Sequence, residues 1–439
     1  MTLPNNPEIV IVGAGAAGIG AGLALTRLGV SFVIMEAKDR IGGRAFTDTT
    51  SIGSPWDQGC HWFHDATRNP LRAIAERVGH PFLAQDEEWA TQWYVDGRAL
   101  TDAEQGAGGM AMGAAFAAVE EAGAAGHDVS LAEAAGDLAE PYGPFVKFVF
   151  EAIGSGPAED SSAVDTARYD GGSSDFPVSG GYGRLIEQLG EGLPVRLGCA
   201  VEAVTSAPGG LAVMTSAGAL RPRAVILTVS NPVLASGRIR LDPALPSGLQ
   251  TVLDDLPCGD CEKIAVELTG AALSGVDHGR FLAQHRGDMF SLQVRPFGRP
   301  MALAFVAGET ARRVQSLSAN AAGTLLADVL VAVYGSDTRK SIGRTAVTGW
   351  SRDPDVLGAY SYAKAGRAAA RPALLAADLA PLFLAGEAHH ISWFSTAHGA
   401  HVSGVEAAHK AARFLGHAAP AADPLWLPTA LTLPLAAAK

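Results

Sequence analysis

A glycine-rich segment near the N-terminus constrains the fold more than any other part of the chain. Residues 8–44 read EIVIVGAGAAGIGAGLALTRLGVSFVIMEAKDRIGGR. The short apolar run Ile9–Val12 is typical of a buried parallel strand, and residues 21–28 predict the helix that follows it. A second apolar run, at residues 31–35, predicts the next strand and is followed directly by an acid. We therefore expect an α/β fold built on a Rossmann-like, nucleotide-binding domain.

The residues of the G-x-G-x-x-G motif between these strands have separate physical tasks. Gly13 permits a tight turn, Gly15 lets a pyrophosphate approach the backbone, and Gly18 lets the helix pack closely on the strand. The helix N-terminus, where Ala17 lies, offers unpaired N–H groups and a partial positive charge to the phosphates. Glu36, about 20 residues further on, is placed to accept hydrogen bonds from a ribose. These residues are the first part of a predicted cofactor site.

A second glycine pair follows the acid. Residues 36–44 read EAKDRIGGR, and a phosphate-facing loop of this kind is not needed by an NAD enzyme. Here the chain resembles the flavin-containing amine oxidase family, which includes monoamine oxidases, polyamine oxidases and spermine oxidase. In that family E-A-x-x-R-x-G-G-R follows the first βαβ unit, and its last arginine contacts the FAD pyrophosphate. The matching residues are Glu36, Ala37, Gly42, Gly43 and Arg44.

Composition narrows the possible partners and locations. The chain has 439 residues, of which 48% are hydrophobic and 18% charged, as expected for a globular protein of two or three domain-sized units. A formal net charge of −12 argues against nucleic acid as a general partner. Four cysteines are too few for a disulfide framework, so we expect a reducing, cytoplasmic location. No signal peptide and no apolar stretch long enough for a membrane span is evident.

Residues 54–70, SPWDQGCHWFHDATRNP, resemble the polyamine oxidase segment G-x-x-W-[I/V]-H-G-x-x-x-N-P. In that family the loop passes beside the flavin, and its histidine faces the substrate channel. The resemblance therefore implies catalytic roles for Trp62 and His64, whereas a hydrogen-bonded structural histidine is the alternative for His64. Asp65 stands where the family usually has glycine. The cofactor-binding residues expected in this loop are Gly59, Cys60, His61 and Trp62.

The middle of the chain adds two residues. A glycine pair at residues 180–181, opening a helix, resembles the family's return to the FAD domain, and the valine at the position of Val201 there touches the adenine end. Lys263 begins a strand-like alternation of apolar residues. Such a lysine is ordinarily a solvated strand end. In the amine oxidases, however, a lysine in this register hydrogen-bonds a water that bridges to flavin N5, which implies a catalytic role.

Residues 347–362, VTGWSRDPDVLGAYSY, resemble the family pattern W-x-x-D-P-x-x-x-G-[S/A/C]-Y. Trp350 is expected at the cofactor, and Tyr360 matches the aromatic residue over the substrate nitrogen. Ala359 occupies the position at which monoamine oxidases carry a cysteine bonded to FAD. The resemblance therefore implies non-covalent FAD.

The last motifs lie in residues 381–414. Gly386 and Glu387 resemble the A-G-E that contacts the FAD phosphate and ribose. Residues 395–404 resemble S-T-x-H-G-A-x-x-S-G, which opens a helix directed at the flavin pyrimidine. Thr396 and Ala397 are expected in this site, and Thr396 replaces the second cage tyrosine of monoamine oxidases.

Metal ligation is not expected. The histidines of residues 389–401 lack a carboxylate or cysteine partner at ligand spacing. The pair Cys258 and Cys261 has no second cysteine pair with which to form a zinc site, and it does not open a thioredoxin-like unit.

The resemblance spans nearly the whole chain. It implies a discontinuous FAD-binding domain of residues 1–80, 180–270 and 345–418. An α+β substrate-binding domain, inserted into it, comprises residues 81–179 and 271–344. Residues 419–439 form a C-terminal tail. Residues 419–439 either pack on the body or mediate a contact, and a homodimer is left open.

The activity implied is oxidation of a polyamine or another primary or secondary amine. A hydride passes from the carbon α to nitrogen to flavin N5, O2 yields H2O2, and the imine hydrolyses to an aldehyde or ketone. Two alternatives remain: a desaturase or dehydrogenase of the phytoene desaturase or protoporphyrinogen oxidase type, and a flavin-bound scaffold. Candidate acids for a second ammonium of a polyamine are Asp65, Glu87 and Glu88.

Overall fold

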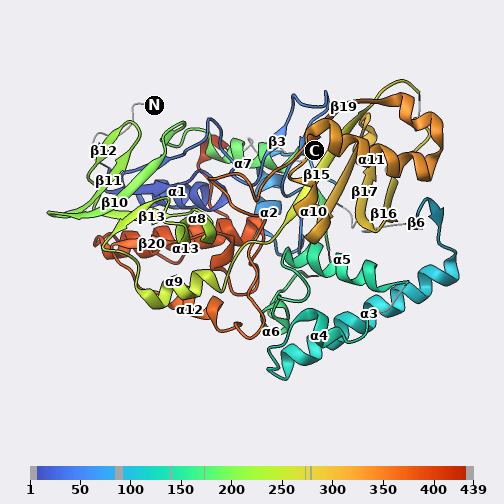
Figure 1. Ribbon diagram of the computed structural model, residues 1–439. Helices are drawn as coiled ribbons and strands as arrows, with labels where there is room; N and C mark the ends of the chain where they lie inside the picture. The colour runs from blue at the N-terminus through green and yellow to red at the C-terminus, as the bar shows by residue number, and fades with distance from the viewer. Residues whose placement is uncertain are drawn as a thin grey trace, which may run out of the picture.

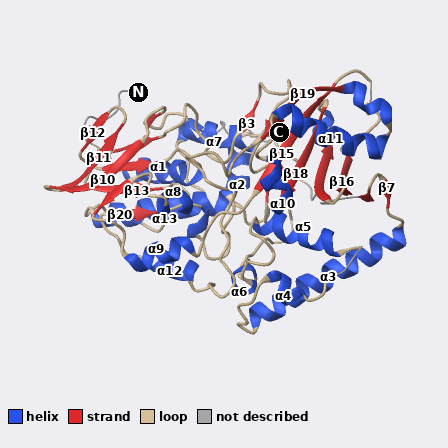
Figure 2. Cartoon of the chain, viewed as in Figure 1, coloured by secondary structure: helices blue, strands red, loops and turns tan. Residues whose placement is uncertain are grey.

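The computed structural model describes residues 7–84, 92–138, 141–172, 174–271, 273–276 and 279–431. Glu87 and Glu88 lie outside these residues. Two lobes lie side by side, one built on a parallel sheet and the other on a larger, mostly antiparallel sheet (Figure 1). Figure 2 shows that helices surround both sheets.

A five-stranded parallel sheet forms the core of the first lobe. Its strands, in spatial order, are β20 Leu382–Leu384, β13 Ala224–Leu227, β1 Ile9–Val12, β2 Phe32–Met35 and β9 Val195–Arg196. Every neighbouring pair runs parallel, and the central strand β1 is wholly buried. Because these strands come from three distant stretches of sequence, the lobe is assembled from a discontinuous chain. The predicted α/β fold with a Rossmann-like sheet is confirmed.

Alternate residues of β1 pack against different elements, as period-two geometry requires. Ile9 and Ile11 pack with four helices, namely α1 Ala16–Leu28, α2 Pro70–Val78, α7 Tyr182–Gly190 and α13 Ala397–Phe414. Val10 and Val12 belong to a second cluster, under α8 Asn231–Ala235, α9 Ser247–Asp254 and α12 Ala370–Ala376. Both faces of the sheet are therefore covered, which is why its strands read as continuous apolar runs.

A four-stranded sheet extends this lobe. Its order is β12 Gly218–Leu220, β11 Gly210–Thr215, β10 Val201–Ala207 and β14 Arg240–Asp242. Strands β11 and β12 form an antiparallel pair. Two short antiparallel pairs lie beyond it, β3 Thr47–Asp48 with β4 Trp56–Asp57 and β5 Trp62–Phe63 with β8 Phe176–Pro177.

A seven-stranded sheet forms the second lobe. Its order is β19 Ile342–Val347, β15 Cys261–Leu268, β18 Met301–Ala307, β17 Asp288–Val294, β16 Gly279–His285, β6 Gln92–Val95 and β7 Arg98–Ala99. Ile264, Val266 and Leu268 pack with α11 Ala319–Tyr334 on one face. Lys263 alternates with them and belongs to the other face. The predicted domain boundary at residue 270 thus falls after a strand of this sheet, because β15 hydrogen-bonds to β18 and β19.

Helices close the remaining sides of the second lobe. They are α3 Asp102–Ala124, α4 Leu131–Ala135, α5 Gly143–Gly154, α6 Ala163–Thr166 and α10 Gly308–Val314. Helices α3 and α4 are rich in alanine, and a Thr101–Glu104 capping box starts α3. Phe145 and Phe148 of α5 pack on the sheet face to which Lys263 belongs.

The described part of the C-terminal tail packs on the first lobe. Asp423 forms an ion pair with Arg27 at 2.9 Å, and the Pro424 carbonyl lies 2.8 Å from His401 Nε2. Leu427 is buried in the first lobe's core. Within the described residues, no helix has the length and apolar character needed to cross a membrane.

Candidate active site

A cavity of about 710 Å³ lies between the two lobes. One end is lined by the glycine loop between β1 and α1 and by the start of β10, and the other by α3, α5, β17 and β18. Every catalytic or cofactor-binding residue predicted from the sequence lines it except Gly18. A Cβ on Gly18 would lie 1.9 Å from the Gly13 carbonyl oxygen, so Gly18 serves the packing of helix on strand.

The glycine loop presents backbone donors to the cavity. Gly13 has φ +104°, a conformation that favours glycine. Gly15 is the N-cap of α1 and supplies no side-chain cap, so N–H groups of the first turn keep no partner inside the helix. The Glu36 carboxylate accepts hydrogen bonds from the Ala14 N–H at 2.7 Å and the Lys38 N–H at 2.9 Å. This end of the cavity suits an anionic group beside a ribose.

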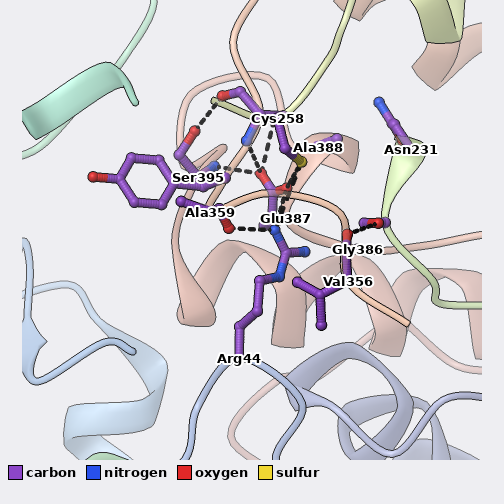
Figure 3. Close-up of polar contacts among 12 residues, drawn as sticks. Arg44, Asn231, Cys258, Val356, Ala359, Gly386, Glu387, Ala388 and Ser395 are labelled. Atoms are coloured by element: carbon purple, nitrogen blue, oxygen red, sulfur yellow. Dashed lines mark hydrogen bonds and ion pairs between the residues drawn. The ribbon is translucent and has the colours of Figure 1, made fainter. Parts of the chain in front are cut away.

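Arg44 and Glu387 form an ion pair beside the loop (Figure 3). Arg44 Nη1 donates to Glu387 Oε1 at 3.1 Å and to the Ala359 carbonyl at 2.7 Å. Its Nε and Nη2 groups have no hydrogen-bond partner among the described residues, although the side chain lines the cavity. Burial opposes ionisation of Glu387, but Arg44, the Ser361 hydrogen bonds and Arg371 together hold its pKa below its usual value.

Lys263 holds the loop at residues 57–61. Its Nζ donates to the carbonyls of Asp57 at 2.8 Å and Gly59 at 2.6 Å, and lies 3.0 Å from His61 Nδ1. Burial lowers the pKa of Lys263 to about 8, although Asp57 favours the charged form. Three acceptors match the three N–H groups of an ammonium. The bridging water expected at Lys263 stays a prediction.

His61 is the loop residue whose side chain contacts Lys263. Burial, with Lys263 and Arg280 adding to it, lowers the pKa of His61 well below its usual value. The ring is therefore neutral, and because Nδ1 accepts from Lys263, Nε2 carries the proton. Nε2 lies 3.5 Å from the Gln293 side-chain amide. His61 was expected at the cofactor, but no motif in the sequence predicted its contact with Lys263.

His64 lies at a more exposed part of the cavity. Its Nδ1 is 3.0 Å from Asp175 Oδ1, and its ring meets Trp62 edge-on, with centroids 6.0 Å apart. Asn69 donates to the His64 carbonyl at 2.8 Å and caps α2, which explains the Asn-Pro at the end of this motif. The resemblance pointed to His64, but its partner Asp175 lies 111 residues away and carried no motif.

Asp65 is not available to a substrate. It is 1% exposed, pairs with Arg68 at 2.7 Å and does not line the cavity. Its φ of +50° lies in the left-handed region that favours glycine, the residue expected at this position from the family pattern.

Tyr360 and Thr396 line the cavity, but their hydroxyl groups form hydrogen bonds with other protein groups. The Tyr360 hydroxyl donates to the Ala152 carbonyl and lies 3.4 Å from Cys261 Sγ. Thr396 is the N-cap of α13: its Oγ1 donates to the Trp393 carbonyl at 2.6 Å and accepts from the Gly399 N–H at 3.0 Å. Tyr360 can thus offer a substrate its ring. The catalytic role of Thr396 stays a prediction.

The comparisons with known proteins agree with this geometry. A family model described as "Flavin containing amine oxidoreductase" matches residues 16–111 and 117–412. The chain belongs to this family. Its members are flavin-binding enzymes that act on CH–NH bonds.

Several curated and solved proteins are similar to this flavin-containing amine oxidoreductase. Polyamine oxidase 4 of Oryza sativa subsp. japonica is 27% identical, over 92% of this chain and 88% of the relative. Lysine-specific histone demethylase 2 of Homo sapiens is 26% identical, over 93% of this chain and 54% of the relative. The structure of cyclohexylamine oxidase from Brevibacterium oxydans IH-35A matches with a TM-score of 0.78 at 19% identity, covering 94% of this chain and 100% of that one, which shows the fold.

The residues present in this amine oxidoreductase fit FAD. The first turn of α1 and the two unpaired groups of Arg44 offer donors to a pyrophosphate, and Glu36 offers an acceptor to a ribose. Trp350, whose Nε1 donates to the Gln58 carbonyl at 3.2 Å, and Val201 at the start of β10 line the same cavity. A Cβ on Gly59 would lie 1.7 Å from the Arg44 carbonyl oxygen, so glycine lets the second loop approach Arg44.

The cysteine pair has no metal partner among the described residues, which hold no cluster of metal-ligating side chains. All four cysteines are free. Burial raises the pKa of Cys60 and of Cys258 to about 12, so both are neutral thiols at neutral pH.

The substrate end of the cavity was largely missed by sequence reasoning. Lys263, Phe305 and Ser291 are register partners across β15, β18 and β17, and all three line the cavity. Only strand pairing connects these positions, so no motif could have found them. The apolar and aromatic residues that line this end are Trp62, Phe116, Val149, Ala152, Ile153, Tyr169, Leu303, Phe305 and Tyr360.

Proposed function

We propose that this chain is an FAD-dependent amine oxidase whose substrate is a monoamine bearing a hydrocarbon group. The carrying observation is that the donors expected for FAD and an apolar, aromatic pocket line one cavity, with Lys263 between them. Bound FAD would accept a hydride from the carbon next to the amine nitrogen, and O2 would then take the electrons to give H2O2. Ala359 offers no thiol for a covalent link, which supports non-covalent binding.

The chain's own residues would select the neutral amine. An ammonium has no lone pair to stabilise the developing iminium, so the amine must lose its proton before reaction. Trp62, Phe305 and the ring of Tyr360 form an environment of low polarity, and desolvation there favours the neutral form. The buried Lys263 ammonium also repels a second cation at this depth.

The charges around the pocket favour a monoamine over a polyamine. The described residues lining the substrate end include two carboxylates, Asp175 and Glu262. Asp175 pairs with His64, and Glu262 accepts hydrogen bonds from the Thr348 hydroxyl and the Ser351 N–H. A second ammonium entering here would lose water without gaining a dedicated carboxylate, which is costly.

Hexylamine and 1,6-diaminohexane test this proposal, because they differ only in the second amino group. Each amine is mixed anaerobically with the yellow protein, and bleaching of the flavin band at about 450 nm is followed. We expect the ratio of reduction rate to apparent Kd to be at least about tenfold higher for hexylamine. A preference for the diamine would overturn the monoamine assignment. Bleaching by neither amine, with dithionite still reducing the flavin, would favour a desaturase or scaffold.

Asp175→Asn sharpens the test. If Asp175 held a distal ammonium, this variant would lose activity on the diamine alone. We expect it to change both amines by a similar factor. Asp170→Asn is the matched control, because Asp170 pairs with Arg68 outside the cavity.

A further inference from the structure

A buried ion pair lies behind the Arg44–Glu387 pair and has no part in the proposed reaction. Arg371 of α12 is 0% exposed, and its Nη2 and Nε donate to Asp165 of α6 at 2.8 Å and 3.1 Å. Its Cζ lies 3.8 Å from the centre of the Phe394 ring. A buried ion pair is weak evidence for stability, since packed apolar residues often serve as well. Its position suggests a different purpose.

The hydrogen bonds from Arg371 have a fixed direction. Arg371 Nη1 donates to Ser361 Oγ at 3.2 Å and to the Ala388 carbonyl at 3.1 Å. Because a guanidinium only donates, Ser361 Oγ must accept here and use its own proton elsewhere. That proton goes to Glu387 Oε2, at 2.7 Å. Arg371 therefore sets which way the Ser361 hydroxyl points.

Glu387 is then held on both oxygens (Figure 3). Oε2 also accepts from the N–H groups of Ser361 at 3.2 Å and Ser395 at 3.1 Å. Oε1 accepts from Arg44. A carboxylate fixed in this way anchors one end of the Arg44 guanidinium and leaves its Nε and Nη2 directed elsewhere.

We propose that Asp165, Arg371 and Ser361 form a relay of positioning residues that orients Glu387 and, through it, Arg44 for the FAD pyrophosphate. This inference rests on the proposed binding of FAD. Asp165 belongs to residues 81–179 and Arg371 to residues 345–418, so the relay also links the predicted substrate-binding and FAD-binding segments. Each of its hydrogen bonds involves a charged group, the kind whose loss costs most.

The relay also keeps Glu387 ionised. The titratable or charged groups facing Glu387 are Arg44, Arg371, Cys258, His389 and Tyr360. Arg44 and the Ser361 hydroxyl both lower the pKa of Glu387 against burial, so loss of the hydroxyl would move that pKa upward from its value in the natural chain. At falling pH the carboxyl would then become neutral and release Arg44. FAD affinity would become pH-dependent in such a variant and stay nearly flat in the natural chain.

The test measures the dissociation constant of FAD from the full-length holoenzyme by the fluorescence of released flavin, from pH 8 to pH 5. We expect Ser361→Ala to raise the Kd about tenfold at pH 8, and by a larger factor at pH 5. Asp165→Asn should act in the same direction. Ser130→Ala is the matched control: this buried serine caps α4 and accepts a hydrogen bond from the Glu133 N–H, and its hydroxyl contacts no member of the relay.

The outcomes are separable. A larger loss of FAD affinity in Ser361→Ala than in Ser130→Ala, growing at low pH, supports the relay. Equal losses with parallel pH dependence mean that general destabilisation explains the effect, and they overturn it. If Asp165→Asn fails to fold, Ser361→Ala alone decides. A natural chain that binds no FAD would overturn the proposed function and the relay with it.

Discussion

The two ends of the cavity are built on different principles. The cofactor end presents mostly backbone groups and short polar side chains from compact motifs, such as the glycine loop and Gly42 to Arg44. The substrate end presents apolar side chains from α3, α5, β17 and β18, which no motif joins. A nucleotide makes the same demands in every relative, whereas a substrate pocket varies with its ligand. Cofactor binding therefore depends on short local motifs, whereas substrate selectivity depends on how distant segments pack.

Replacing Lys263 gives the largest expected effect, because this residue lies where the two ends meet. Lys263→Met removes the donors to the Asp57 and Gly59 carbonyls and to His61. We expect FAD to remain bound while reduction by amine slows by about 100-fold to 10,000-fold, the range typical of a lost proton-handling group. Stopped-flow absorbance and the ratio of FAD to protein measure both quantities.

The control for this prediction is Lys340→Met, which removes an exposed lysine that pairs with Asp337. Loss of FAD together with activity would show that the two ends are not separable. Unchanged reduction would remove Lys263 from the mechanism.

Glu262→Gln probes the strand behind the pocket rather than the reaction. Burial raises the pKa of Glu262 from an ordinary value of 4.5 to about 7, against hydrogen bonds from Thr348, Trp350 and Ser351. Between these pH values the folded chain keeps a proton that the unfolded chain has lost, so the stability of the natural chain falls as pH rises. The variant lacks this titration. Its free energy of unfolding, relative to the natural chain, should rise by about 3 kcal/mol from pH 4.5 to pH 8.

Urea unfolding at several pH values, with FAD saturating, checks the Glu262 prediction. Glu406→Gln, at an exposed position of α13, serves as the control and should leave the pH dependence unchanged. If the free energy of unfolding depends on pH in the same way for Glu262→Gln and the natural chain, burial does not shift the pKa of Glu262 and the prediction is wrong.

Tyr360→Phe gives the smallest expected effect. The hydroxyl faces the Ala152 carbonyl and Cys261, so the substrate meets the ring, which phenylalanine retains. We expect less than about a threefold change in the rate of flavin reduction, because one neutral hydrogen bond outside the reaction is lost. Tyr362→Phe, which loses a hydroxyl bonded to Asp160, is the control. A fall as large as that of Lys263→Met would place the hydroxyl in the chemistry.

Much of the fold could be predicted from the periodicity of apolar residues and from the turn-forming residues between them. The strand Ile9–Val12 has the predicted bounds, because it is a strongly patterned apolar segment followed by a clear turn signal. The sheet to which β15 belongs was harder to predict from the sequence. Its partners β18 and β19 begin 33 or more residues after it ends, and pairing over such distances leaves no local signal.

The nucleotide-binding end could be predicted from local sequence, because glycine spacing, an acid after the second strand and a helix start define backbone geometry over a few residues. Tertiary structure alone decided that Lys263 meets His61, that His64 meets Asp175 and that Arg371 stands behind Glu387. Each of these contacts depends on which face of a strand, helix or loop a side chain occupies once distant segments pack. A shift of one residue in register would point such a strand residue away from its partner, and no short stretch of sequence records that register.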